Sequence, residues 1–149
     1  MTVNPDVVRR RCTEIEESVA RLEGLAAIPV DEFLASQDHL DVASYRLLVA
    51  IEAALALCYH VSARLLKRAP EDYAACFETL RNADLIPADL AERLRRMARF
   101  RNLLVHMYWR IEYRLVHEML NRDLGDLRAF ASAMTRLVPF VPNAEDKPS

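Results

Sequence analysis

Apolar side chains recur at every third or fourth position along most of the chain, which is the spacing of one face of an α-helix. The clearest run lies within residues 38–68, where Leu47, Ile51 and Leu55 follow one another at this spacing. No segment has the pattern of a strand, and no internal repeat is present. The pattern therefore predicts helices over residues 5–25, 31–35, 38–68, 70–82, 87–110, 114–121 and 124–138.

Three of the predicted helices begin with the same combination of residues. Pro5, Pro70 and Pro87 are each followed within two residues by a carboxylate. Proline suits the first position of a helix, and a carboxylate in the first turn meets the positive end of the helix dipole. Because the connections are short, neighbouring helices are expected to run antiparallel. We predict an all-α antiparallel helical bundle with four to five main helices plus short helices. It forms a single domain over residues 1–140, followed by a flexible tail over residues 141–149.

The composition agrees with a helical fold and argues against several enzyme classes. Two of the 149 residues are glycines, so a phosphate-binding loop, a dinucleotide-binding turn or an all-β barrel is not expected. The formal net charge of −2 means that any site for a polyanion must be a local patch. The basic side chains are nearly all arginines, since Lys67 and Lys147 are the two lysines, and arginine can bind two phosphate oxygens at once.

The cysteines and histidines give no sign of a metal or cofactor site. The three cysteines include no Cys-x-x-Cys pair and are interpreted as reduced core thiols. No histidine lies at metal-ligand spacing from another histidine, a cysteine or a carboxylate. We therefore predict no metal and no cofactor. The longest apolar run, residues 53–59, is too short to cross a bilayer, and the N-terminus is polar, which predicts a cytoplasmic protein without a membrane segment.

The predicted helix over residues 87–110 departs from the usual pattern of a surface helix. At about 100° per residue, Arg101 falls in the middle of an apolar stripe. A charge at such a position needs an ion-pair partner or has a functional role. A snorkelling arginine or a buried ion pair with a glutamate is the structural alternative. A second side of this helix carries polar groups within about 60° of one another, for which a solvated face is the alternative. These polar groups are Arg95, Arg99, Asn102 and His106.

A third side of the same helix is apolar again. Phe100, Leu103 and Met107 form this strip, so the helix is either central to the bundle or shared with a second subunit. Tyr108 and Trp109 add aromatic surface beside it, on which exposed bases could stack. A position in the core is the usual one for such aromatic residues.

The run from Arg101 to Tyr108 resembles the signature of HEPN-domain ribonucleases. That signature is an arginine, then a polar residue, here Asn102, and a histidine four to six positions further on, here His106. The additional His-x-Tyr spacing is similar to the HepT branch, the toxins of HepT–MntA toxin–antitoxin pairs. The resemblance extends over about residues 33–138. Further similar segments are residues 51–53, 69–73, 85–87 and 90–93.

The resemblance implies an HEPN-like fold and a metal-independent endoribonuclease. In such an enzyme the ribose 2′-OH attacks the adjacent phosphate. The catalytic residues implied are His106, as general acid and base, and Arg101, as the clamp on the phosphate oxygens. Asn102 would orient His106 or the substrate, and Tyr108 would donate a hydrogen bond to a phosphate oxygen. The arginines expected to bind RNA are Arg95, Arg99 and Arg110.

The resemblance also implies two kinds of protein partner. On a straight helix Arg101 and His106 point about 140° apart, and the family solves this with a two-fold dimer whose motifs meet in a composite cleft. We therefore expect a homodimer or a higher homo-oligomer. In the family, the antitoxin MntA is a minimal nucleotidyltransferase that adds AMP to the motif tyrosine, which is Tyr108 here. The added phosphate and bulk would repel an RNA backbone.

Two other functions stay open at this point. The chain could be a non-catalytic HEPN partner that holds a substrate for a nucleotidyltransferase, although such proteins tend to lack the arginine and histidine together. It could also be a helical scaffold in which Arg101 belongs to a structural ion pair. We hypothesise that Glu52, in the segment 38–68, pairs with Arg101 in the free protein.

Overall fold

The structure of the chain is a computed structural model that describes residues 2–139. No strand is present among these residues, which confirms the predicted all-α fold. The predicted tail over residues 141–149 lies outside the described residues, so the domain boundary stays a prediction. The helices are α1 (Pro5–Ala26), α2 (Val30–Ala35), α3 (Gln37–Arg64), α4 (Tyr73–Asn82), α5 (Ala88–His106), α6 (Tyr113–Arg122) and α7 (Leu124–Thr135), with a 3-10 turn η1 (Tyr108–Arg110) between α5 and α6.

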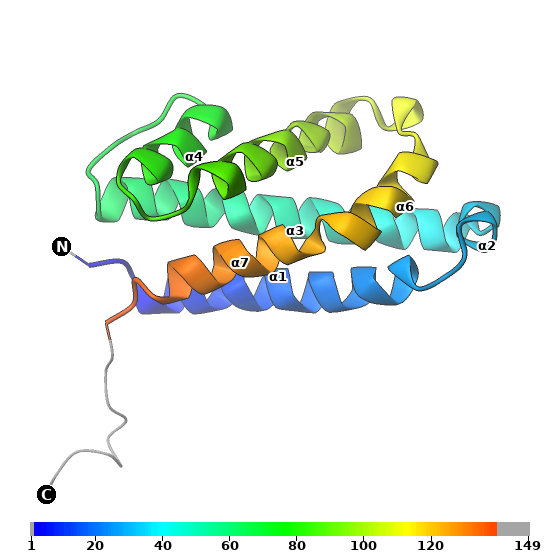
Figure 1. The fold of residues 1–149 in the computed structure, drawn as a ribbon, viewed down its shortest axis with the longest axis horizontal. Helices are drawn as coiled ribbons and strands as arrows, with labels where there is room; N and C mark the ends of the chain where they lie inside the picture. Colours follow the sequence, from blue (N-terminus) through cyan, green and yellow to red (C-terminus); the bar gives the residue numbers. More distant parts are fainter. Residues whose placement is uncertain (1, 140–149) are drawn as a thin grey trace, which may run out of the picture.

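The long helices lie side by side and α3 is central among them. Figure 1 shows α1, α3, α5 and α7 along the long axis of the bundle, with α4 at one end and α2 at the other. α3 contacts α1, α4, α5 and α7, and α5 also packs against α4 and α7. Among the described residues, α3 alone is long and apolar enough to span a membrane. Half of its most apolar window is buried in the bundle, and a core helix of this kind meets the same criterion.

The structure moves two of the three helix starts predicted at prolines, by one residue at Pro87, which is the extended N-cap of α5, and by three residues at Pro70. Pro5 begins α1 as predicted. Pro70, however, does not begin the next predicted helix, because α4 starts at Tyr73. Asp72 caps α4 in an extended conformation, and its Oδ1 accepts a hydrogen bond from the backbone N–H of Ala75 at 2.8 Å. A side-chain cap of this kind satisfies a backbone donor that the helix itself leaves free, so it fixes the start of the helix.

Replacing Asp72 by alanine is expected to destabilise the fold by about 1 kcal/mol, because one backbone donor of α4 loses its partner. The melting temperature should fall by about 2–4 °C for a domain of this size. The neighbouring variant Glu71→Ala removes an exposed carboxylate that does not cap the helix, and it serves as the control. Equal melting temperatures for both variants would contradict the capping role.

The core is built from the inward faces of all the long helices. Phe77 of α4 meets Phe130 of α7 edge to face, with ring centroids 5.7 Å apart. Cys58 and Cys76 are buried and Cys12 is half-buried, and all three thiols are free, as predicted. Burial raises the pKa of the Cys58 thiol, which keeps it protonated. Other fully buried side chains are Phe33, Ile15, Leu22, Leu47, Leu57, Leu80, Leu94, Leu127 and Met134.

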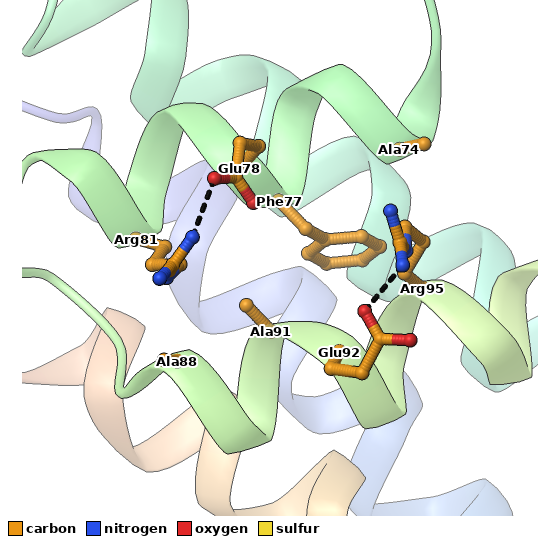
Figure 2. Close-up of a pocket in the computed structure, with 8 residues that line it drawn as sticks. All are labelled: Ala74, Phe77, Glu78, Arg81, Ala88, Ala91, Glu92 and Arg95. Carbon is orange, nitrogen blue, oxygen red and sulfur yellow. Dashed lines mark hydrogen bonds and ion pairs between the residues drawn. The ribbon is translucent and has the colours of Figure 1, made fainter.

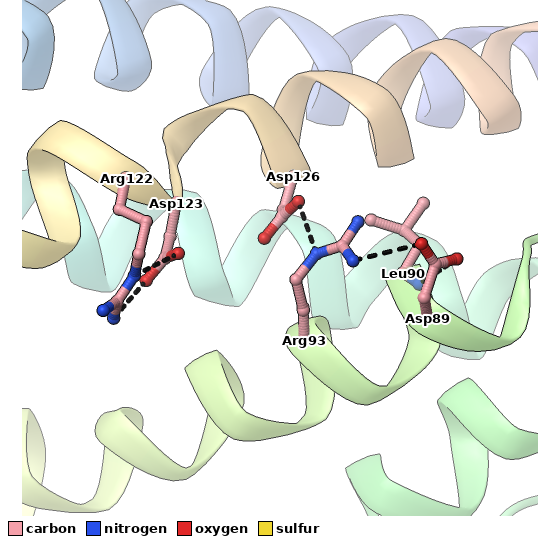
Figure 3. A network of polar contacts seen from close by, with 6 residues as sticks. All are labelled: Asp89, Leu90, Arg93, Arg122, Asp123 and Asp126. Carbon is pink, nitrogen blue, oxygen red and sulfur yellow. Dashed lines mark hydrogen bonds and ion pairs between the residues drawn. The ribbon is translucent and has the colours of Figure 1, made fainter.

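Ion pairs join α7 to its neighbours α5 and α1. Figure 3 shows the Arg93 guanidinium of α5 between two carboxylates. Its Nε donates to Asp126 of α7 at 3.0 Å and its Nη1 donates to Asp89 at 3.2 Å. On the other side of α7, Arg128 donates two hydrogen bonds to Glu16 of α1. Pairs that are open to solvent on at least one side contribute little stability, so the packed core contributes most to holding the helices together.

Candidate functional site

The motif segment lies at the end of α5, where the helix stops earlier than the sequence predicts. α5 ends at His106, because Met107 leaves the helical conformation with φ −139° and ψ 43°. The three residues after Met107, Tyr108–Arg110, form η1. The chain then returns to the core at Ile111, which is buried. The prediction of a helix to residue 110 is therefore wrong. Tyr108 lies in the turn that follows α5 instead of on the helix.

Arg101 is paired with a glutamate on the neighbouring helix. Its Nε donates a hydrogen bond to Oε1 of Glu52 on α3, and the two side chains form an ion pair. The hypothesis that Glu52 is the partner is confirmed, whereas a deeply buried Arg101 is not found. The Arg101 side chain is 34% exposed and that of Glu52 is 45% exposed. The guanidinium is therefore held in place with part of its surface open to an anion.

The predicted polar side of α5 is open to solvent over most of its length. Arg99, Asn102 and His106 are all exposed. Arg95 differs, because its Nη2 donates to Glu92 while its Nε is buried without a partner among the described residues. The hydrogen bond from Arg95 lowers the pKa of the Glu92 carboxyl. This side of α5 therefore offers the exposed Arg99 and His106, but Arg95 is already partly neutralised.

A pocket of about 240 Å³ lies between α4 and α5, at the Arg95 end of this polar side. Figure 2 shows Phe77 between two ion pairs, one from Arg81 to Glu78 on α4 and one from Arg95 to Glu92 on α5. Both arginines face carboxylates, so the pocket has no strong preference for an anion. It lies away from the motif residues at the other end of α5.

A larger hollow of about 480 Å³ opens on the side of α5 that faces α6 and α7. Arg93 and Arg122 line it together with Asp123 and Asp126. Figure 3 shows each of these arginines bonded to a carboxylate, Arg93 to Asp126 and Arg122 to Asp123. Carboxylates inside the hollow thus neutralise these two arginines, while a third lining arginine, Arg96, lies 3.7 Å from Glu92 outside it. Neither Arg101 nor His106 lines either of these hollows.

The two aromatic residues after α5 are on the surface. The Tyr108 and Trp109 side chains belong to residues that are 66% and 69% exposed. Their rings meet edge to face, with centroids 5.5 Å apart. The usual expectation of a core position for these aromatics is therefore wrong here. The early end of α5 explains it, because η1 directs both side chains away from the helix face that enters the core.

One chain does not bring Arg101 and His106 together. Both lie on the same continuous helix, and five helical steps separate their directions by about 140°. Arg101 leans toward α3, where it meets Glu52, while His106 is exposed at the last turn of α5. Within one chain the two side chains therefore leave α5 in different directions. A three-ligand cluster for a metal is not found among residues 2–139, and the expectation of metal-free chemistry stays a prediction.

Comparison with known proteins identifies the family of the sequence and solved structures that share its fold. Residues 15–134 match the family described as ribonuclease HepT-like. Among curated proteins, no significant sequence match is found. Solved structures at 15–20% identity share the fold. One is the tri-AMPylated HEPN toxin of Shewanella oneidensis in complex with an MNT antitoxin, with 20% identity, a TM-score of 0.81 and coverage of 88% of this chain and 98% of that chain.

Two further structures extend the likeness. A toxin–antitoxin complex with AMP-PNP has 19% identity and a TM-score of 0.79, and the match covers 87% of this chain and 98% of that chain. YutE from Bacillus subtilis, described as a cytosolic protein of unknown function, has 15% identity and a TM-score of 0.81, with 95% and 99% of the two chains covered. Together with the match over residues 15–134, the fold leads to one conclusion: the chain belongs to the HepT-like ribonuclease family.

Proposed function

We propose that this chain is the toxin of a toxin–antitoxin pair and acts as a metal-independent endoribonuclease. The observation that carries the proposal is the environment of the Arg101 guanidinium. Glu52 holds its guanidinium in place, part of it stays open to solvent, and the exposed His106 follows on the same helix. A purely structural ion pair would require neither the exposed imidazole nor the exposed Tyr108 hydroxyl close behind it in the chain.

The proposed reaction is an internal transfer at one phosphodiester. His106 removes the proton from the ribose 2′-OH, or returns a proton to the leaving oxygen. The bond from the 2′-oxygen to phosphorus forms and the bond from phosphorus to the 5′-oxygen breaks. The products are a 2′,3′-cyclic phosphate and a 5′-hydroxyl end. Arg101 binds the non-bridging oxygens, where negative charge grows in the transition state, while Asn102 orients His106 or the substrate and Tyr108 donates to a phosphate oxygen.

A homodimer with a shared cleft would let the two groups meet. The outward face of α3 supports this arrangement, because it carries apolar surface next to Glu52. Tyr45 is 61% exposed on this face, and Leu48 and Val49 are half-buried. These residues and Glu52 border an open hollow of about 500 Å³ between α1 and α3, which the charged side chains of Arg46, Glu14 and Glu17 also line. A second chain on this face would cover it and bring a second motif helix toward the first.

The arginines of the motif helix would guide the RNA backbone into that cleft. Arg99 and Arg110 have no carboxylate within 4 Å in the part of the chain that the structure describes, so their charges are available to phosphates. Arg95 would contribute less, since Glu92 already neutralises it. The formal net charge of the whole chain is −2, so the attraction for RNA comes from this local patch.

The proposed antitoxin is a nucleotidyltransferase similar to MntA, acting in the cytoplasm. It would transfer AMP from ATP to Tyr108, whose oxygen attacks the α-phosphate while pyrophosphate leaves. The exposure of Tyr108 in the turn after α5 makes its hydroxyl accessible to another enzyme. The AMP group adds a negative charge and bulk beside Arg101 and His106. It would therefore exclude an RNA phosphate by repulsion and by volume.

The test uses the purified chain, a labelled single-stranded RNA and an excess of EDTA. Cleavage that leaves 2′,3′-cyclic phosphate and 5′-hydroxyl ends is expected, and an RNA with a single 2′-deoxyribose at the main cut should resist there. The non-catalytic alternative predicts binding of RNA or of a nucleotidyltransferase with no cleavage. Absence of cleavage by freshly purified, unmodified protein would therefore reject the nuclease and favour that alternative.

Replacing Glu52 by alanine is expected to lower the rate constant kcat about 10-fold, because Arg101 loses the contact that fixes its position. The loss of stability should stay below about 1 kcal/mol, since both side chains are partly exposed. Glu52→Gln, which keeps a hydrogen-bond acceptor, should restore part of the rate. Glu118→Ala, an exposed carboxylate on α6, is the control. An unchanged kcat in Glu52→Ala would show that the pair has no positioning role.

A further inference from the structure

Trp109 is the one tryptophan of the chain, and it is on the surface. The residue is 69% exposed, more than any other large apolar residue in the described part. Burying an indole contributes more to a core than almost any other side chain, so exposure of this size is typical of a binding surface. Its aromatic neighbour Tyr108 meets it edge to face, so at least one flat face of the indole is left without an aromatic partner in this pair.

The segment that leads to Trp109 carries mostly positive charge, and the first carboxylate after it is the exposed Glu112. Residues 93–111 contain six arginines and no aspartate or glutamate. Carboxylates from other positions pair with four of these arginines, namely Arg93, Arg95, Arg96 and Arg101. Arg110, which directly follows Trp109, is exposed, and its guanidinium contacts the sulfur of Met107 at 3.9 Å. An aromatic face and an unneutralised guanidinium thus lie next to each other in the chain.

We propose that Trp109 is a stacking platform for a base of single-stranded RNA and that Arg110 binds the phosphate beside that base. This inference rests on the proposed ribonuclease function and adds the class of substrate to it. Stacking on a side chain requires a base that is free of its neighbours, which a duplex does not offer. Every base has a flat face, so this contact selects single strands over duplexes without selecting a sequence.

The position of Trp109 relative to the motif fits this role. Trp109 follows His106 by three residues, a stretch of chain that spans at most about 11 Å. The stacked base would therefore belong to a nucleotide close to the phosphate held at Arg101 and His106. The platform would hold the strand on one side of the scissile bond and reduce its freedom to slide.

A second copy of the chain or a protein antitoxin could also cover an exposed aromatic pair. RNA is favoured because the surface combines a planar face with an unpaired cation, which matches the base and phosphate of one nucleotide. A purely apolar protein contact would leave the charge of Arg110 without a partner. If a second copy of the chain or the antitoxin covers Trp109 instead, the fluorescence titration described next gives a different result from the one expected for RNA.

The experiment reads the fluorescence of this single tryptophan. The full-length chain is titrated with a 2′-O-methyl oligoribonucleotide, which cannot be cut because it has no free 2′-OH. Saturable quenching of Trp109 is expected, and a hairpin duplex of equal length should quench far less. By anisotropy of the labelled oligonucleotide, Trp109→Ala should bind about 10- to 100-fold more weakly. Trp109→Phe should recover part of the affinity, and Leu115→Ala, an exposed apolar residue on α6, should bind as the wild type does.

The outcomes separate this inference from the proposed function. If the wild type cleaves RNA but Trp109→Ala keeps the same Kd and KM, the platform is rejected and the nuclease stands. If the oligonucleotide quenches Trp109 and the wild type cuts nothing, the platform is supported and the nuclease is rejected. If the fluorescence of Trp109 changes with protein concentration but not with added oligonucleotide, a second copy of the chain covers Trp109 and the inference is overturned. Quenching by the antitoxin alone, or by a duplex as strongly as by a single strand, would overturn it as well.

Discussion

Replacing His106 by alanine is expected to lower the rate of RNA cleavage about 10²- to 10⁴-fold, which is the usual contribution of one general acid or base. The fold should be unaffected. His106 is exposed at the last turn of α5, and it makes no side-chain hydrogen bond within residues 2–139. The measurement is the initial rate of cleavage of a labelled single-stranded RNA in EDTA, together with the melting temperature of both proteins. In the cell, the same substitution should relieve the toxicity of overexpression.

His60 provides a matched control for this variant. It lies near the C-terminal end of α3, where its Nε2 accepts a hydrogen bond from the backbone N–H of Asn4 at 2.9 Å. Glutamine can accept the same bond, so His60→Gln should retain cleavage within about twofold of the wild type while His106→Ala loses it. Full activity in a folded His106→Ala protein would reject the role of His106 and, with it, the proposed reaction.

The regular part of the fold is predictable from sequence because it depends on local pattern. The spacing of apolar residues in α3 predicts which face of this helix is buried, and Pro5 predicts the start of α1. The errors fall at helix ends. Proline at position 70 has the same signature as Pro5, but Asp72 offers a better cap two residues later. The end of α5 is set by the return of Ile111 to the core, a tertiary requirement that no local signal announces.

The candidate site is likewise predictable from the sequence only where it depends on local spacing. The spacing of Arg101 and His106 can be recognised in the sequence, and so can the need of Arg101 for a carboxylate. The sequence supports the pairing with Glu52 only as a hypothesis, because contacts between α3 and α5 depend on how the helices pack. The sequence pattern does not decide whether Trp109 is exposed, since a helix that continued to residue 110 would place this side chain beside an apolar strip. One early helix end thus changes the surface beside the motif.

Replacing Arg101 by alanine is expected to reduce cleavage about 10²- to 10³-fold, because the guanidinium that stabilises the charge growing on the non-bridging oxygens is lost. Arg101→Lys should recover little of this loss, since an ammonium group is a point charge and cannot bind two oxygens in the planar arrangement of a guanidinium. Neither change should lower stability by more than about 1 kcal/mol, given the partial exposure of the pair with Glu52. Arg136→Ala, an exposed arginine beyond the end of α7, is the control. Unchanged cleavage in Arg101→Ala would reject the clamp.

Mixing the two inactive variants tests whether the site is shared between chains. If Arg101 of one chain acts with His106 of its partner, a dimer of one Arg101→Ala chain and one His106→Ala chain keeps one intact pair of the two. Such a mixed dimer, purified through two different tags, should show about half of the wild-type rate, as two-fold symmetry requires. A site within one chain predicts no recovery, because each chain lacks one of the groups. Since the two side chains leave α5 about 140° apart, recovery is the result that we expect.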